Sequence, residues 1–144
     1  MTAQQIETGE AIRNQEQADH LLHLQRDILE MVARNAEYKT ALDALCRATE
    51  TLLPNSAASI MLFDPTHTFL EVKSAPSIPN EAVDFLNGLM PRPEAGSCGT
   101  AVFNNEPVFV ENPQAAPRRK NMRGFSSDFN IFSCWPMPIR AQEH

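Results

Sequence analysis

The chain has 144 residues, of which 42% are hydrophobic and 21% charged, and its formal net charge is −6. This length and composition predict one globular domain with a short appended segment, and the acidic balance argues against a protein that binds nucleic acid or an anionic membrane. The three cysteines, without paired spacing, and a polar N-terminus without a signal sequence predict a reduced, cytoplasmic protein.

Residues 1–35 are expected to form a helical extension. Residues 1 to about 16 are polar and lack periodicity, which predicts a segment that is frayed or helical only through its context, and a helix is expected from Gln17. Its apolar face is built from Leu21, Leu24, Ile28 and Met31 and widened by Leu22, Leu29 and Val32. Such a face suits a helix that packs on its own domain, and it equally suits a dimerisation helix that carries a signal between domains.

A second helix is expected over residues 38–52. The apolar pattern resets at Asn35, which is expected to cap this helix. Tyr38, Leu42, Leu45 and their neighbours lie at amphipathic spacing, and Pro54 stops the helix.

A β-hairpin is predicted next. Residues 57–64, A-A-S-I-M-L-F-D, are apolar on both faces, which is typical of a central strand that is covered on both sides. A turn at 64–67 leads into a half-exposed strand at 68–75, in which apolar and charged residues alternate.

A helix is predicted at 80–89, followed by a proline-stiffened connector and then by the segment E-A-G-S-C-G-T-A-V-F-N-N-E-P-V-F-V-E at 94–111. This segment predicts a short helix that starts between two glycines, an Asn-Asn turn and a strand at 107–110. A last strand at 131–139 carries Pro136 and Pro138, whose missing N–H groups lie on one edge. Because the chain ends soon afterwards at His144, we expect one further strand, which would cover the exposed edge, to be missing.

Three motifs in this order resemble the GAF domain family. They are G-S-C-G-T-A at 96–101, P-V-F-V-E at 107–111 and C-W-P-M-P-I at 134–139, and they are similar to the variant at the sensory input end of bacterial histidine kinases and cyclic-di-GMP cyclases or phosphodiesterases. The resemblance implies an α+β fold with a central antiparallel sheet flanked by helices, from which the family's closing strand and final helix would be missing here. The N-terminal extension would then cover residues 1–35 and the sensory domain residues 36–144.

The resemblance also implies a non-catalytic role, in which any enzyme activity belongs to an attached or partner output domain. It places a ligand pocket between the sheet and the segments 79–89, 94–103 and 112–130. The candidate ligand-binding residues are Gly96, Ser97, Cys98, Gly99, Phe103, Phe125, Phe129 and Trp135. The same segments could instead cover a collapsed, ligand-free pocket in a domain that serves only dimerisation and signal relay. A basic run follows Glu111 where the family has an acidic-aromatic stretch, and this difference slightly favours the second interpretation.

The cysteines allow a redox alternative. Cys98 is expected at a helix N-terminus, where the helix dipole can lower the pKa of a thiol, although a small residue packed between glycines explains it more simply. In the resembled fold Cys98 and Cys134 could approach each other as a redox pair. A related branch reduces free methionine-(R)-sulfoxide, but the second motif that carries its catalytic cysteine has no counterpart between Cys98 and Cys134.

No cofactor follows from the sequence. Some GAF sensors bind haem, but His20 and His23, three residues apart on a helix, and His67, in a turn, do not stand out as axial ligands, and no metal site is predicted. The expected partners are a second copy through the N-terminal helix, a small-molecule ligand and an output domain, with no nucleic acid and no membrane.

Overall fold

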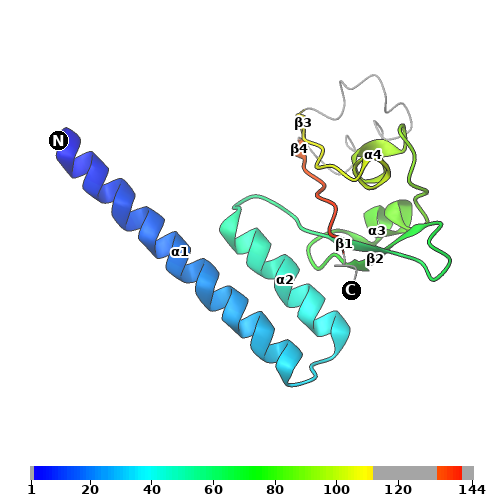
Figure 1. The fold of residues 1–144 in the computed structure, drawn as a ribbon, viewed down its shortest axis with the longest axis horizontal. Helices are drawn as coiled ribbons and strands as arrows, with labels where there is room; N and C mark the ends of the chain where they lie inside the picture. Colours follow the sequence, from blue (N-terminus) through cyan, green and yellow to red (C-terminus); the bar gives the residue numbers. More distant parts are fainter. Residues whose placement is uncertain (1, 112–132, 141–144) are drawn as a thin grey trace. The chain divides into compact units, whose positions relative to one another are not determined.

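The computed structural model describes residues 2–111 and 133–140. These residues form four helices and four short strands in the order α1, α2, β1, β2, α3, α4, β3, β4 (Figure 1). They divide into two compact units, Met1–Ile60 with Lys73–Ile78, and Met61–Val72 with Pro79–His144. The mixture of helices and short antiparallel strands confirms the predicted α+β class. No described helix combines the length and the apolar composition needed to cross a bilayer.

The first unit is built on α1 (Ala3–Ala33) and α2 (Tyr38–Leu52), which pack against each other (Figure 1). Helix α1 begins well before the expected start at Gln17, so of the two outcomes expected for residues 3–16, frayed or helical by context, the structure has the helical one. The reason is a reciprocal cap: Thr2 Oγ1 accepts a hydrogen bond from the Gln5 N–H, and Gln5 Oε1 accepts one from the Thr2 N–H. This capping box satisfies two backbone donors that the first turn would otherwise leave unpaired.

Asn35 ends α1 and does not cap α2, contrary to the prediction. Its backbone is left-handed, with φ of 54°, a conformation that asparagine tolerates better than most residues. The Asn35 N–H donates to the Val32 carbonyl, and the Ala36 N–H donates to the Met31 carbonyl at 2.9 Å. These two bonds make a Schellman motif, and Glu37 takes the N-cap position of α2 without a side-chain cap.

Helix α2 ends at Leu52, ahead of Pro54, as predicted. The Glu50 side chain of α2 binds two later segments of the same unit. Its Oε1 accepts a hydrogen bond from the Ala58 N–H at 2.9 Å, and its Oε2 accepts one from Ser77 Oγ at 2.7 Å. The buried residues of α2 are Cys46 and Ala48.

Strands β1 (Ile60–Phe63) and β2 (Leu70–Ser74) form the predicted hairpin as a two-stranded sheet. Asp64 organises its turn: Oδ1 accepts from the backbone N–H groups of Thr68 and Phe69 at 2.8 and 2.7 Å, and Oδ2 accepts from the N–H and hydroxyl of Thr66. These bonds hold the pKa of the Asp64 carboxyl well below its usual range, the Phe69 N–H having the largest effect.

The prediction that the first strand is central and covered on both sides is wrong for the described residues. In that part of the chain β1 pairs with β2 alone, and Leu62 and Phe63 are 39% and 40% exposed. Successive side chains of a strand point to opposite faces, so these two exposures show that neither face of β1 is fully covered beside its turn.

In the second unit, α3 (Asn80–Leu86) buries Ala82 and Leu86. The predicted helix at 80–89 ends early because Gly88 adopts φ of 80°. The chain then turns back onto β2: the Gly88 N–H donates to the Leu70 carbonyl at 2.9 Å, and the Leu70 N–H donates to the Leu89 carbonyl at 2.8 Å. A loop after α3 therefore extends the hairpin sheet by one bridge.

Helix α4 (Gly96–Asn104) follows and ends at Asn105, whose left-handed backbone confirms the predicted Asn-Asn turn. Strands β3 (Val110–Glu111) and β4 (Ser133–Cys134) then pair antiparallel, with Val110 opposite Cys134. Both are shorter than the strands predicted at 107–110 and 131–139, of which residues 131 and 132 lie outside the described chain.

The pairing of these strands extends beyond β3 and β4 by one bond, from the Val108 N–H to the Pro136 carbonyl at 3.1 Å. Pro136 has no N–H with which to return a bond to Val108. The expectation that the prolines interrupt pairing along one edge is therefore confirmed at Pro136.

Candidate functional site

The candidate site is the first turn of α4, which consists of Gly96, Ser97, Cys98 and Gly99. Among the described residues no side chain caps this helix at its N-terminal end. The backbone N–H groups of a first helical turn have no acceptor within the helix, which is the feature that lets such turns bind anions; here Gly96, Ser97 and Gly99 are buried. The helix starts at Gly96, the first of the two glycines, and Gly99 lies within its first turn, so the helix start predicted between them is one residue or more too late.

The two glycines of this turn are needed for different reasons. Gly96 has φ of 72°, a left-handed conformation that most residues avoid. Gly99 lies under Ala95, and a Cβ added at Gly99 would come within 2.6 Å of the Ala95 Cβ. Thr100 secures the turn, since its hydroxyl donates to the carbonyls of Gly96 and Pro93 at 2.6 and 2.9 Å.

Ser97 joins this turn to β4. Its side chain is buried and its Oγ donates to Cys134 Sγ at 3.2 Å. Cys98, the next residue along the helix, is half-buried, and all three cysteines of the chain are thiols. The structure therefore brings Cys134 beside the neighbour of Cys98, and the redox pair of Cys98 and Cys134 stays a prediction.

The predicted aromatic lining is only partly described. Phe103, on α4, is 56% exposed and Trp135, next to β4, is 61% exposed, so neither is enclosed by the described residues. Phe125 and Phe129 lie outside the described residues, as does the whole of the predicted covering segment 112–130. The ligand-binding assignment stays a prediction.

Trp135 has an aromatic neighbour that the sequence analysis did not select. Its ring lies against Phe109 in an edge-to-face arrangement, with the ring centroids 6.2 Å apart and the planes at 86°, a favourable geometry. The two residues face each other because Val110 pairs with Cys134, which places position 109 opposite position 135. The alternation of residues along each strand indicates which positions share a face, but the strand register is needed to show that Phe109 lies opposite Trp135.

A second polar cluster, in the first unit, was also missed. The Ser74 hydroxyl, buried at the end of β2, donates to Asp43 Oδ1 at 2.5 Å, and Lys39 Nζ lies 3.1 Å from Asp43 Oδ2. The Ser74 hydrogen bond, followed by that of Lys39, lowers the pKa of the Asp43 carboxyl. Burial raises the pKa of the Cys46 thiol, which keeps Cys46 protonated and unreactive.

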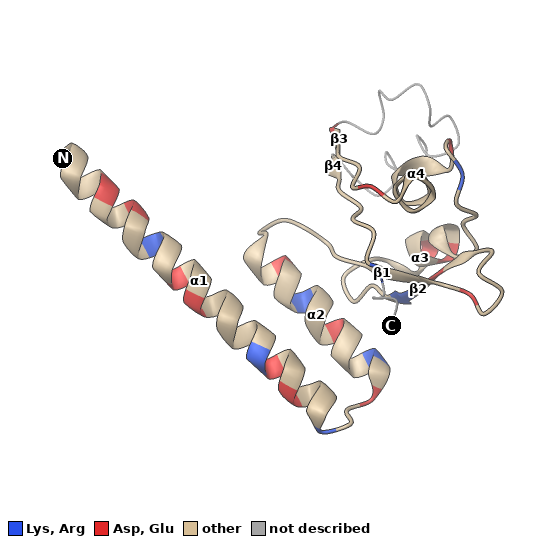
Figure 2. Cartoon of the chain, in the orientation of Figure 1, with Lys and Arg blue, Asp and Glu red and all other residues tan. Residues whose placement is uncertain are grey.

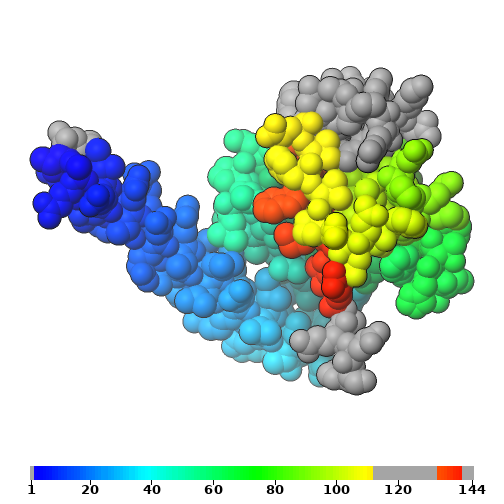
Figure 3. Space-filling view, turned by 45° about the horizontal axis from the view of Figure 1, so that its top comes forward, coloured from blue at the N-terminus to red at the C-terminus, as the bar shows by residue number. Residues whose placement is uncertain are grey.

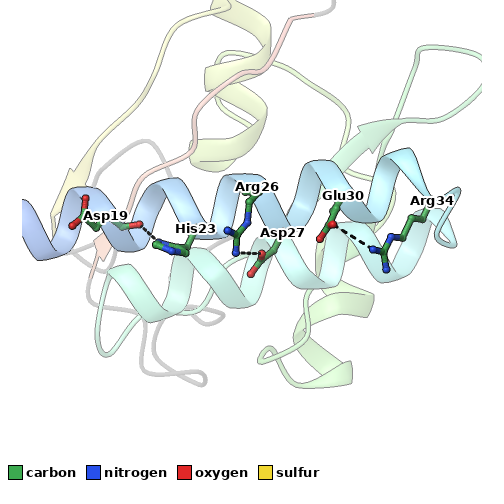
Figure 4. Close-up of polar contacts among 6 residues, drawn as sticks. All are labelled: Asp19, His23, Arg26, Asp27, Glu30 and Arg34. Carbon is green, nitrogen blue, oxygen red and sulfur yellow. Dashed lines mark hydrogen bonds and ion pairs between the residues drawn. The ribbon is translucent and has the colours of Figure 1, made fainter.

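One histidine of α1, His23, contacts the helix itself. His23 Nδ1 lies 2.6 Å from the Asp19 carbonyl oxygen, and the contacts between Arg26 and Asp27 and between Glu30 and Arg34 also stay within α1 (Figure 4). Across residues 2–111 and 133–140, no group of three or more acidic, histidine or cysteine residues is arranged to hold a metal ion.

Comparisons with known proteins agree with the resemblance seen in the sequence. The chain is 26% identical over 128 residues to the methyl sulfide methyltransferase-associated sensor of Methanosarcina acetivorans, and the alignment covers 89% of this chain but 13% of that protein. No solved structure matches the chain. The model of the GAF domain family matches residues 35–144, which is most of the chain, and the chain therefore belongs to the GAF domain family.

Proposed function

We propose that the chain is a non-catalytic sensory domain of a bacterial signal-transduction protein. It senses a small molecule, dimerises through α1, or does both, and thereby controls an output domain such as a histidine kinase or a cyclic-di-GMP enzyme in the cytoplasm. The observation that carries the proposal is the GAF match over residues 35–144. The similar protein from Methanosarcina is named a sensor, which points to the same kind of role.

Two features of the structure support this role. The first turn of α4 presents backbone donors beside the buried Ser97, an arrangement that suits an anionic or polar small molecule. Helix α1 leads into the GAF-matched region as 31 residues with no buried side chain, which is unusual for a helix that only stabilises its own domain.

The proposal is tested by assaying the purified chain for chemistry and for a chromophore. Incubation with free methionine sulfoxide and a thioredoxin reducing system should give no turnover above a control without protein. Turnover that is lost in Cys98→Ser would contradict the non-catalytic assignment. A Soret band after expression would identify haem as the ligand and would contradict the interpretation that the domain binds no ligand.

Redox sensing is a second candidate, favoured by one contact. Ser97 Oγ lies 3.2 Å from Cys134 Sγ, so the helix that carries Cys98 touches the strand that carries Cys134. A disulfide needs Cα atoms within about 7 Å. Treatment with diamide followed by peptide mass spectrometry should yield a linked Cys98–Cys134 peptide if this candidate is right, and a mixture containing no such peptide would eliminate it.

A further inference from the structure

Asn87 and Gly88 lie where the loop after α3 meets β2. Asn87 Oδ1 accepts a hydrogen bond from the Val72 N–H at 2.7 Å. The Gly88 N–H donates to the Leu70 carbonyl at 2.9 Å, and the Leu70 N–H donates to the Leu89 carbonyl at 2.8 Å. We call these three hydrogen bonds the α3 bridge. They cover one edge of β2, where a strand otherwise leaves its N–H and C=O groups open.

The α3 bridge requires each of these two residues for a separate reason. Gly88 has φ of 80°, a conformation that residues with a side chain rarely adopt. Asn87 supplies a short side-chain acceptor that takes the place of a backbone carbonyl opposite the Val72 N–H. The fold therefore places an Asn-Gly dipeptide at this point, and that dipeptide is chemically labile.

An asparagine that precedes glycine can lose its amide without an enzyme or a cofactor. The Gly88 nitrogen attacks Asn87 Cγ, so that a new N–Cγ bond forms and the Cγ–Nδ2 bond breaks. Ammonia leaves with the proton of the Gly88 nitrogen, and a cyclic imide remains. Water then adds to one of the two imide carbonyl carbons that flank Gly88 N: cleavage of the new bond gives aspartate, and cleavage of the original peptide bond gives isoaspartate. Glycine favours the attack because it has no Cβ to obstruct its nitrogen.

The bridged structure opposes this reaction. The Gly88 nitrogen and the Asn87 side chain are both held by hydrogen bonds to β2. The backbone of Asn87 is extended, with ψ of 137°, so its Cβ does not eclipse the Gly88 nitrogen about the Cα–C bond, as ring closure requires. Both residues are exposed, and the green part of the chain, which contains α3, reaches the surface on the face shown (Figure 3). Water is therefore at hand whenever the bridge opens.

We propose that Asn87–Gly88 is a site of spontaneous deamidation whose rate is set by the opening of the α3 bridge. The proposal goes beyond the sensory assignment and does not depend on it. Solvent-exposed hydrogen bonds, such as the one between Val72 and Asn87, open locally at a lower free energy than the whole domain unfolds. Because the product does not recover its amide, the modification accumulates with the age of the chain.

The isoaspartate product disrupts the α3 bridge and reaches the candidate site. Its main chain runs through Cβ and Cγ, so the added methylene shifts Gly88 and Leu89 out of register with β2. Leu89 Cδ2 and the Met90 carbonyl oxygen lie 3.6 and 3.7 Å from the position that a Cβ would occupy at Gly99. The segment after Asn87 thus contacts the first turn of α4, which would have to adjust to the longer backbone.

The aspartate product keeps the length of the main chain and adds a negative charge. The charge lies at the C-terminal end of α3, a helix that carries Glu81 and Asp84 and no lysine or arginine (Figure 2). A carboxylate is unfavourable at a helix C-terminus. Either product therefore leaves a bridge that differs from the original one.

The site and its control by the fold are tested by peptide mass spectrometry of the full chain after incubation at mildly alkaline pH, with and without urea. In urea, Asn87 should be converted to the acid faster than Asn55, because Asn55 precedes Ser56, whose side chain hinders the attack. Without urea, Asn87 should react at least about tenfold more slowly than in urea, which corresponds to an opening free energy of about 1.4 kcal/mol. Equal rates at Asn87 in the two conditions would overturn the control by the bridge. A chain in urea that keeps its amide at Asn87 would overturn the site itself.

The α3 bridge is opened within the folded chain by Val72→Pro. Proline has no N–H for Asn87 Oδ1, and an edge strand tolerates proline where the N–H faces away from the neighbouring strand. The rate at Asn87 should rise in the absence of urea while the rate at Asn55 stays the same, with circular dichroism to verify the fold. Val72→Ala is the matched control, since it shortens the same side chain and keeps the N–H, and it should react like the unmodified chain. An equal rise in both variants, or no rise in Val72→Pro, would overturn the role of this hydrogen bond.

The effect of the longer backbone is tested by comparing the two products. Asn87→Asp reproduces the aspartate product, and isoaspartate in an aged chain is identified by methyl transfer from protein isoaspartate methyltransferase. The isoaspartate fraction should unfold at a lower urea concentration than Asn87→Asp, and equal stabilities would contradict the proposed loss of the bridge. These measurements use neither ligand binding nor oligomeric state, so their failure would leave the sensory assignment in place.

Discussion

Gly99 has the most tightly constrained position in the candidate site. Its helical backbone suits any residue, so the requirement for glycine is one of space beneath Ala95. Gly96, three residues earlier, is constrained by its positive φ instead. Two glycines that look equivalent in the motif thus stabilise the same helix start by unrelated means.

We predict that Gly99→Ala lowers the free energy of unfolding by about 1–3 kcal/mol, the usual cost of overpacking. The new methyl group would lie 2.6 Å from the Ala95 Cβ, so the helix start must shift. Urea denaturation measures the change. Gly9→Ala is the control, because nothing lies within 4 Å of a Cβ at that position and alanine should raise the stability of α1 by up to about 1 kcal/mol. Equal effects of the two variants would contradict the steric explanation.

Asp64 makes a pH-dependent contribution to stability. Its backbone hydrogen bonds lower the pKa of the folded carboxyl below the unfolded value, which is about 3.9. The stabilisation is therefore complete above about pH 4 and is lost as the pH falls through the folded pKa. The difference in unfolding free energy between the unmodified chain and Asp64→Asn should shrink steadily below about pH 4. A difference that stays constant from neutral pH to acid would exclude the carboxylate as its source.

At the scale of elements, α1 and α4 end in the same way. Asn35 and Asn105 are both left-handed, and each is followed by a residue whose N–H reaches back to close a Schellman motif. Asn105 has an additional role. Arg140 Nε donates to Asn105 Oδ1 at 2.7 Å, and Arg140 Nη2 donates to the Asn105 carbonyl at 2.8 Å. Asn105 thus holds the chain beyond β4 against the end of α4.

Glycine substitution should separate these two roles. Asn35→Gly should raise stability by a few tenths to about 1 kcal/mol, because glycine adopts positive φ without strain. Asn105→Gly should gain less or lose stability, since the bond from Arg140 Nε is worth about 0.5–1.5 kcal/mol. Thermal denaturation of both variants gives the comparison. Identical gains would mean that the Arg140 contact contributes nothing.

The elements that could be predicted from the sequence are those governed by local signals. Helix α2, the hairpin turn at Asp64 and the end of α4 at Asn105 follow from periodicity, turn chemistry and capping. The full length of α1 was missed because its N-terminal part is started by the cap at Thr2 and lacks the apolar periodicity that marks a helix in the sequence. The end of α3 was missed because Leu89 pairs with Leu70, a contact that spans residues distant in the sequence.

For the molecule as a whole, the motifs identified the family, and the match over residues 35–144 agrees. The sequence could predict which residues belong to the candidate site, but not which of them contact one another. The contact between Ser97 and Cys134 and the packing of Phe109 on Trp135 depend on strand register, which the sequence pattern does not specify.

We propose that the GAF domain is joined here to a helix, α1, that dimerises it. Sedimentation equilibrium of the full chain and of a chain limited to residues 35–144, the GAF-matched region, tests it most directly, with circular dichroism to verify that the shorter chain is folded. We predict a dimer for the full chain and a folded monomer for residues 35–144. A monomeric full chain, or a shorter chain that dimerises equally well, would contradict the account.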